Sequence, residues 1–192
     1  MLSRRNLILG ALTSAALLPA STALAHHTKK SRKKFKLAKK YLPQSVRYNS
    51  EYKRGTIVVD PRNHYLYLIE RRGRARRYGV GVGKAGLAFR GTATIQRKAE
   101  WPSWTPTQNM IRREPQKYLK YAKGVPGGIN NPLGARALYL YRNGRDTYFR
   151  IHGTTQPWSI GQSVSAGCIR MINEHVEDLY ERVPIGTRVI VL

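Results

Sequence analysis

Cysteine is almost absent from this sequence of 192 residues, which contains only Cys168. A single thiol cannot form a disulfide within the chain, so a disulfide-stapled fold is excluded. Zinc sites made of cysteine pairs are excluded as well, and the five histidines show no HExxH-type spacing. The sequence therefore predicts no metal site, and it leaves open why one thiol is present.

Acidic residues are also scarce. There are 10 Asp and Glu residues against 35 Lys and Arg residues, which gives a formal net charge of +25. Such an excess indicates polyanionic surroundings. Nucleic acid, anionic lipid and anionic cell-wall polymer all fit this description, and the charge alone does not choose among them.

Long hydrophobic runs are missing. The apolar stretch from Leu7 to Leu18 is interrupted and too short to span a bilayer, which needs about 20 apolar residues. With the basic start and the small-residue end Ala23-Leu24-Ala25, it predicts a secretory signal peptide over residues 1–25. Ser3-Arg4-Arg5 resembles a twin-arginine signal, although a general secretory signal with two arginines is the alternative. Export to the periplasm argues against a nucleic-acid partner.

Residues 26–54 are predicted to form a basic flexible arm and linker. Between Lys29 and Lys40, eight of twelve residues are basic. Blocks of like charge tend to stay disordered as interaction tails. This arm would hold the protein near an anionic wall or membrane surface, or it would be a solvated linker with no specific partner. The part from Tyr41 to Arg54 is expected to be a loop.

Residues 55–192 fit one domain, by the usual size of roughly 100–200 residues. The segments 55–60 and 65–70 alternate like strands around a turn, and Asn143-Gly144 is a strong hairpin signal. Apolar spacing predicts a helix over 173–183, with Asn173 as its cap. The pattern predicts a mostly β fold, a sandwich or barrel with one or two short helices.

Two further stretches need an interpretation. The Pro- and Gly-rich segment from Trp101 to Pro132 is too long for a plain connection, which favours a lid or binding loop. The glycines Gly81, Gly83 and Gly86 resemble a phosphate loop at first sight. No strand–loop–helix context and no GK[ST] follow them, so they are interpreted as bends or bulges in a sheet.

The candidate chemistry lies near the C-terminal end. His152 stands at the end of a predicted strand, and Cys168 follows Gly167 shortly before the predicted helix. An imidazole can take the proton of a thiol, which gives a Cys–His nucleophile pair. Arg170 would favour the thiolate, and its guanidinium can bind a substrate carboxylate through two hydrogen bonds. The amides of Gly167 and Cys168 would form an oxyanion hole.

The segments HGTTQPWSIG and SVSAGCIRM together resemble the signature of the YkuD-type L,D-transpeptidases. In that family a His-Gly pair is followed, after roughly a dozen residues, by Ser-X-Gly-Cys-X-Arg. The similarity extends back through NPLGARALYL, PSWTPT and GTIVVD, and so covers about residues 55–192. One departure is Ala166, where many members have histidine, and this puts any role for a second histidine in doubt.

The resemblance implies a β-sandwich fold and a reaction on peptidoglycan stem peptides. Cys168 would attack the carbonyl before the terminal D-alanine of a tetrapeptide stem, with His152 as general base. D-Alanine would leave, and an amine would resolve the thioester. The backbone carbonyl of Gly153 would orient the imidazole, and the remaining expected site residues are Ser165, Gly167 and Arg170. The thioester carries the acyl group, so no cofactor is expected.

Other readings stay open. Water would resolve the thioester in an L,D-carboxypeptidase, and the sequence does not distinguish this enzyme from a transpeptidase. The acceptor amine would belong to a second stem peptide or to an outer-membrane protein. A non-catalytic wall-binding module is a third reading, but binding alone would need neither His152 nor Cys168.

Overall fold

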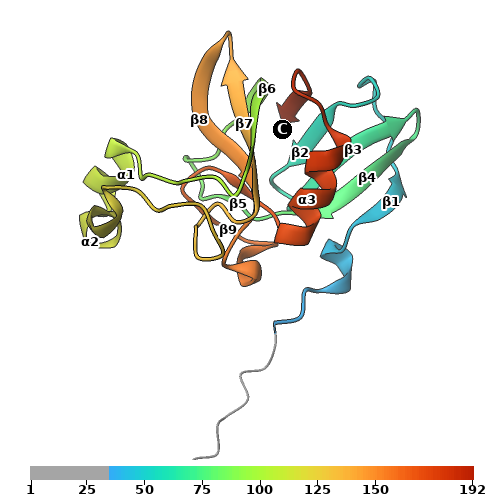
Figure 1. Cartoon of the computed structure of the whole chain (residues 1–192). Helices are drawn as coiled ribbons and strands as arrows, with labels where there is room; N and C mark the ends of the chain where they lie inside the picture. Colours follow the sequence, from blue (N-terminus) through green and yellow to red (C-terminus); the bar gives the residue numbers. More distant parts are fainter. Residues whose placement is uncertain (1–34) are drawn as a thin grey trace, which may run out of the picture. The chain divides into compact units, whose positions relative to one another are not determined.

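The computed structural model describes residues 35–192. The predicted signal peptide and residues 26–34 of the basic arm lie outside this range. The strands are β1 (Gln44–Arg47), β2 (Ile57–Asp60), β3 (Tyr65–Arg71), β4 (Arg74–Gly79), β5 (Val82–Gly83), β6 (Gly91–Glu100), β7 (Arg136–Arg142), β8 (Arg145–His152), β9 (Ser163–Ser165), β10 (Ile169–Arg170) and β11 (Arg188–Val191). The helices are α1 (Gln108–Arg113), α2 (Pro115–Tyr118) and α3 (Asn173–Arg182), with 3-10 turns η1 (Lys39–Tyr41), η2 (Leu119–Tyr121) and η3 (Pro157–Ser159). The prediction of a mostly β fold with few short helices is confirmed (Figure 1).

Nine strands form one mixed sheet in the order β1-β4-β3-β2-β11-β6-β7-β8-β10, and β5 pairs with β9 in a small second sheet. The hairpins predicted around residues 61–63 and at Asn143-Gly144 are confirmed as the antiparallel pairs β2–β3 and β7–β8. Asn143 and Gly144 both have positive φ angles, as a tight two-residue hairpin turn requires. The last strand, β11, runs parallel to β2, and β10 runs parallel to β8.

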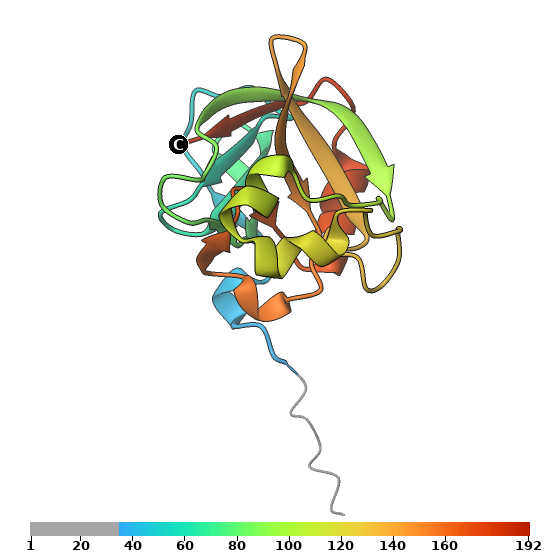
Figure 2. The same cartoon turned by 90° about the vertical axis from the view of Figure 1, so that its left-hand side faces the viewer.

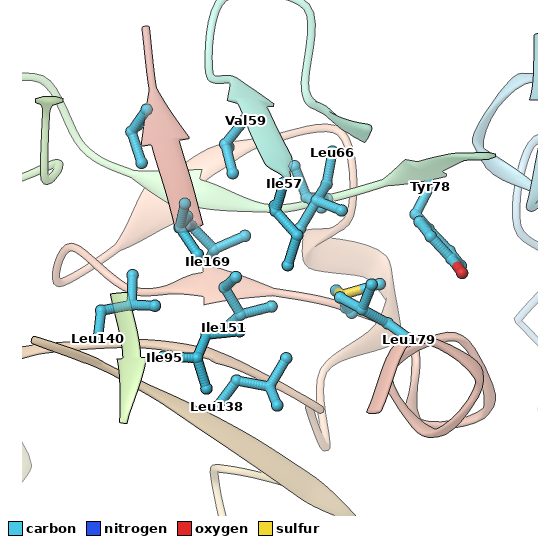
Figure 3. Packing of buried hydrophobic residues seen from close by; sticks show 14 of the residues in the cluster. Ile57, Val59, Leu66, Tyr78, Ile95, Leu138, Leu140, Ile151, Ile169 and Leu179 are labelled. Carbon is cyan, nitrogen blue, oxygen red and sulfur yellow. The ribbon is translucent and has the colours of Figure 1, made fainter. Parts of the chain in front are cut away.

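The hydrophobic core draws side chains from distant parts of the large sheet. Ile57 and Leu66 come from β2 and β3, Leu138 and Ile151 come from β7 and β8, and all four are fully buried in one cluster. Strands this far apart in the sheet order bring their side chains together only because the sheet curls on itself. Figure 3 shows the two groups facing each other across the core. The curled sheet thereby supplies two packed layers of a sandwich.

Helix α3 covers one side of this core. Val176 and Leu179 are buried at helical spacing, as the sequence pattern predicts. The hydroxyl of the fully buried Tyr78 donates a 2.7 Å hydrogen bond to Asp178, and Arg76 donates to the same carboxylate at 2.8 Å. These bonds anchor α3 to β4. Among residues 35–192, no helix has the length and apolar character needed to cross a membrane.

The segment from Tyr41 to Arg54 differs from the expected loop. It contains β1, which pairs in antiparallel register with β4. Just before β1, Tyr41 packs so closely against Gly79 that a Cβ atom at that position would overlap with the tyrosine. The guanidinium of Arg77 also donates to the carbonyl of Lys40 at 3.3 Å. The folded unit therefore begins before the expected start at residue 55.

The segment from Trp101 to Pro132 contains two short helices rather than a plain loop. The hydroxyl of Thr107 accepts a 3.2 Å hydrogen bond from the amide of Met110 and so caps α1. The Trp104 and Tyr118 rings lie 6.3 Å apart and hold the segment together. Figure 1 shows α1 and α2 standing out from the sheet, and Figure 2 shows the same helices from the front.

Candidate active site

The pairing of β8 with β10 sets the positions of the two predicted catalytic residues. Arg170 lies opposite His152, and Ile169 lies opposite Ile151. The two isoleucines belong to the core cluster. Because successive residues of a strand point to opposite faces, His152 and Arg170 lie on the other face. Cys168 comes immediately before β10, so the fold brings the predicted pair onto neighbouring segments of the chain.

A tight turn leads from β9 to the cysteine. The hydroxyl of Ser165 donates to the carbonyl oxygen of Cys168 at 2.6 Å and accepts from the amide of Gly167 at 3.1 Å. Gly167 has a φ of 131°, and a Cβ there would lie 2.5 Å from a ring carbon of Phe149. The Gly167 amide is thus already engaged. Of the two amides predicted for an oxyanion hole, that of Cys168 has no hydrogen-bond acceptor among residues 35–192.

His152 is buried, with 5% of its surface exposed. Its Nδ1 lies 2.6 Å from the carbonyl oxygen of Gly153. A carbonyl oxygen can only accept, so Nδ1 carries the proton and Nε2 carries the lone pair of the neutral ring. The family resemblance implies this contact, in which the Gly153 carbonyl orients the imidazole of His152. No hydrogen bond joins the ring to the sulfur of Cys168 in this conformation, in contrast to the expected contact.

The sulfur faces an irregular part of β8. Its Sγ lies 3.9 Å from the carbonyl oxygen of Tyr148, which has a positive φ of 61°. The pairing of β7 with β8 shifts register at this point, which makes a bulge. Asp146 closes the bulge, because its carboxylate accepts two hydrogen bonds from Arg150, at 2.6 and 2.7 Å, and one from the Tyr148 amide at 2.8 Å.

Burial dominates the protonation states of both residues. Burial and the charge of Arg170 lower the pKa of His152 to about 3, although carbonyls of Gly153 and Leu133 act to raise it. Burial raises the pKa of Cys168, although the Arg150 amide and the charges of Arg150 and Arg170 act to lower it. Both groups are therefore neutral at pH 7 in this conformation. Arg170 favours the thiolate, as the sequence leads us to expect, but burial outweighs its charge.

Arg170 lies beside this pair without a carboxylate partner among residues 35–192. One of its guanidinium nitrogens donates to the side-chain oxygen of Gln156 at 3.0 Å. Burial lowers the pKa of Arg170, while Cys168 and Tyr118 act to raise it. Arg170 is thus a partly buried cation that forms no ion pair with an acidic residue among residues 35–192.

Other candidate chemistries find no matching geometry in the described residues. No group of three or more His, Cys, Asp or Glu side chains within residues 35–192 could hold a metal ion. Gly83 lies in β5, and a Cβ there would come within 2.8 Å of the Gly167 backbone. The glycine cluster therefore permits close packing under the cysteine turn, as the prediction of sheet bends indicates, and no helix follows it directly.

The family model of the YkuD L,D-transpeptidase catalytic domain matches residues 54–191. The chain belongs to the YkuD L,D-transpeptidase family. The resemblance identified from the sequence is thereby confirmed, and so is its extent to within a residue at each end.

Curated relatives carry the same family name. A probable L,D-transpeptidase, ErfK/SrfK, of Escherichia coli is 33% identical over 150 residues, which cover 77% of this chain and 47% of the relative. A putative L,D-transpeptidase, YqjB, of Bacillus subtilis is 35% identical over 138 residues, which cover 70% of this chain and 69% of the relative. The chain spans about half the length, or less, of the Escherichia coli relatives it matches.

Solved structures support the fold of this YkuD domain. A carbamoyl enzyme formed by an L,D-transpeptidase with avibactam is 19% identical and aligns with a TM-score of 0.54, covering 73% of this chain and 49% of that one. A Brucella melitensis structure, described as a probable carnitine operon oxidoreductase caia, is 56% identical with a TM-score of 0.56. It covers 81% of this chain and 96% of that chain.

Some residues of the YkuD site could not be found from the sequence. Asp146 and Arg150 are four apart, a spacing that suggests a helix pair and not a strand, and only the bulge brings them together. Gln156 lies in the connection after β8, where no pattern singles it out. Tyr148 reaches the sulfur through its backbone, which leaves no signal in the side chain.

Proposed function

We propose that this protein is an exported L,D-transpeptidase that uses Cys168 as its nucleophile and His152 as its general base. One observation carries the proposal. The only cysteine of the chain comes immediately before β10, which pairs with β8 so that Arg170 lies opposite His152, and Arg170 influences the pKa of both residues. Membership of the YkuD family supports the reaction class.

The proposed first step starts from a neutral pair. Nε2 of His152 accepts the thiol proton as the sulfur attacks the carbonyl carbon before the terminal D-alanine of a tetrapeptide stem. The amide of Cys168 would donate to the oxyanion that forms. Collapse of the tetrahedral intermediate breaks the amide bond, and the imidazolium gives its proton to the departing D-alanine amine. A thioester between the stem and Cys168 remains.

In the second step an acceptor amine attacks the thioester. His152 takes a proton from that amine, and the thiol is regenerated when the new amide bond forms. A second stem peptide would give a 3→3 cross-link, and an outer-membrane protein would become attached to the wall. Water in place of the amine would give an L,D-carboxypeptidase. The two-step acyl transfer would need no cofactor, since the sulfur of Cys168 carries the acyl group between the steps.

Arg170 would bind a carboxylate of the stem peptide. Arg170 is half-buried, donates to the neutral Gln156 and forms no ion pair with an acidic residue among residues 35–192, so a substrate carboxylate would supply the missing negative charge. Gly153 would hold His152 through its carbonyl, while Ser165 and Gly167 would shape the turn before the nucleophile.

We further propose that residues 1–25 direct export to the periplasm, with Ser3-Arg4-Arg5 addressing the twin-arginine route. The basic residues from Lys29 to Lys40 would then hold the enzyme near the anionic wall or membrane surface. The net charge of +25 supports such a partner. Export also argues against nucleic acid.

The decisive experiment incubates the purified protein with a tetrapeptide stem donor and follows intact mass and products. The expected result is an acyl adduct at Cys168, release of D-alanine and a cross-linked dimer. Cys168→Ala should form no adduct and release no D-alanine while keeping its melting temperature. Tripeptide without dimer would indicate the carboxypeptidase. A wild-type protein with no adduct, or a variant that still releases D-alanine, would refute the mechanism.

A carbapenem offers a second test of the same nucleophile. It presents a strained acyl donor, so the family resemblance predicts that it acylates Cys168. Peptide mapping after incubation would locate the adduct. Modification of another residue, or of none, would count against Cys168 as the nucleophile.

A further inference from the structure

The side chain of Asn173 joins two loops next to the candidate base. Its Oδ1 accepts a hydrogen bond from the amide of Thr154 at 3.0 Å and a second from the amide of Ala135 at 3.2 Å. The sequence predicts this residue as the cap of α3. In the structure Asn173 is the first residue of the helix and makes no capping bond, and the N-cap position belongs to Ile172. The asparagine oxygen is used elsewhere.

Two glycines make this contact possible. A Cβ atom on Gly134 or on Gly153 would overlap with Oδ1 of Asn173. The loop before β7 and the loop after β8 therefore approach α3 as bare backbone. Loops packed this closely around one acceptor have little freedom to shift without breaking both hydrogen bonds.

The link to His152 runs through a single peptide group. The amide N–H of Thr154 and the carbonyl of Gly153 belong to the same planar, trans unit, so they point in opposite directions. Asn173 holds the N–H end, and Nδ1 of His152 donates to the carbonyl end at 2.6 Å. Rotation of this plane would break both contacts together. Fixing one end therefore fixes the acceptor that sets the tautomer of the imidazole.

We propose that Asn173 is a positioning residue for catalysis, which holds the Gly153–Thr154 peptide plane so that His152 keeps its proton on Nδ1 and presents Nε2 as the base. This inference rests on the proposed function, because it assigns Nε2 the role of accepting the thiol proton. The second loop held by Asn173 contains Leu133, whose carbonyl also favours a protonated ring. Asn173 holds the Gly153–Thr154 peptide group directly, whereas the Gly134 amide next to the Leu133 carbonyl donates to the carbonyl of Asn131.

The test compares Asn173→Ala with Asn173→Asp, which keeps an acceptor oxygen in the same place. Glu174→Ala is the matched control, since Glu174 is exposed in the first turn of the same helix. The first readout is the ¹⁵N spectrum of the His152 ring, assigned by its loss in His152→Gln. The second readout is the rate of reaction with the tetrapeptide donor, measured over a range of donor concentrations so that kcat and KM are obtained separately.

For Asn173→Ala we expect loss of the pure Nδ1–H tautomer and a kcat about 10- to 100-fold lower, with KM changed less than about twofold. Asn173→Asp should retain the tautomer and most of kcat, and Glu174→Ala should match the wild type. If the alanine variant does not fold, Asn173→Ser, whose hydroxyl does not span both amides, takes its place. A folded alanine or serine variant with the wild-type tautomer and kcat would overturn the proposal.

The outcomes also separate this inference from the proposed function. If the wild type forms no adduct with the donor, the function fails, and the ¹⁵N spectra still report whether Asn173 fixes the tautomer. If the wild type acylates normally while Asn173→Ala lowers kcat and Asn173→Asp fails to restore it, the oxygen acceptor is not what matters. That result would reject the positioning role and leave the transpeptidase intact.

Discussion

The hydroxyl of Ser165 donates a 2.6 Å hydrogen bond to the carbonyl oxygen of Cys168, three residues further along the chain. The hydroxyl oxygen of Ser165 also accepts a hydrogen bond from the amide of Gly167 at 3.1 Å. Ser165 is buried, with 2% of its surface exposed, so it reaches the turn from inside the protein. This geometry assigns it to the shape of the turn that carries the nucleophile.

Replacing Ser165 with alanine should loosen that turn. The change removes two hydrogen bonds and leaves the part-buried Cys168 carbonyl and the buried Gly167 amide unpaired, at a cost of about 1–3 kcal/mol in the free energy of unfolding. The rate of Cys168 acylation should fall about 10- to 100-fold. Urea unfolding and donor kinetics measure the two effects. Ser163→Ala, two residues earlier, removes only a solvent-exposed hydrogen bond to His64 and should change stability by less than about 0.5 kcal/mol. Equal effects of the two variants would contradict this assignment.

Gly167→Ala should be more damaging than an alanine at another glycine with positive φ. Its Cβ would meet the Phe149 ring at 2.5 Å and the carbonyl oxygen of Leu87 at 2.6 Å, in addition to the strain of the φ angle. We expect a loss of about 3 kcal/mol or more, with no measurable acylation. Gly144→Ala has a φ of 74° but no atom within 4 Å of its Cβ. It should cost about 1 kcal/mol and leave acylation unchanged. Comparing the thermal unfolding of Gly167→Ala and Gly144→Ala separates the cost of the steric overlap at Gly167 from the cost of backbone strain.

Much of the fold could be predicted from local patterns. The alternating segments, the Asn143-Gly144 turn and the apolar spacing of α3 each depend on neighbouring residues, and each appears in the structure. Strand β1 was missed because its four residues have no buried side chain, so no alternation marks them. Helices α1 and α2 were missed because they are short and lie among prolines and glycines.

The candidate site shows a similar division. Cys168 and His152 stand out by rarity and context, and their spacing along the chain matches adjacent strands. The protonation states could not be predicted, since burial of both groups depends on the whole fold and outweighs the nearby arginines. Asn173 illustrates the same limit. Its helix position could be predicted, but its contacts with Thr154 and Ala135 depend on two loops distant in sequence.

The ion pair between Asp146 and Arg150 should stabilise the bulge that faces the sulfur. Asp146→Ala removes three hydrogen bonds to a carboxylate and leaves the mostly buried Arg150 without its partner. We expect a loss of about 2 kcal/mol and an acylation rate about 10-fold lower, because the Tyr148 carbonyl can then move relative to Cys168.

A matched control for this change is Glu114→Ala. It also removes one ion pair, with Lys117, but both partners are about half exposed. Such a pair contributes about 0.5 kcal/mol or less. Chemical unfolding and donor kinetics of both variants provide the measurement. If Asp146→Ala behaves like Glu114→Ala, the bulge does not depend on its ion pair.

The raised pKa of Cys168 makes a prediction for thiol alkylation. Because burial favours the neutral thiol, the rate of reaction with iodoacetamide should rise with pH along a curve whose midpoint lies above that of an unperturbed cysteine. The protein unfolded in urea supplies the control, since it presents the same thiol without burial. Its midpoint should lie near 8.5. A folded midpoint at or below the unfolded one would show that the arginines outweigh burial.

The lowered pKa of His152 makes the folded state sensitive to acid. The folded pKa is about 3 and an unperturbed histidine has a pKa of about 6.5, so between these values the unfolded chain binds a proton that the folded chain does not. The free energy of unfolding should therefore decline as pH falls from about 6.5 towards 3, by up to about 1.4 kcal/mol per pH unit from this residue. Above pH 6.5 both states are neutral and the effect vanishes.

Urea unfolding between pH 4 and 7 tests this expectation when the wild type is compared with His152→Gln. Burial also lowers the pKa values of His64 and His175, so the variant should keep a residual slope in the same direction. Asp178 affects stability in a lower pH range. Burial opposes its ionisation, but hydrogen bonds from Arg182, Tyr78 and Arg76 outweigh burial and lower the pKa of Asp178 to about 2. Its contribution is therefore lost mainly below about pH 4. Identical slopes for the wild type and His152→Gln would mean that His152 can take up a proton in the folded protein without the cost that its burial implies.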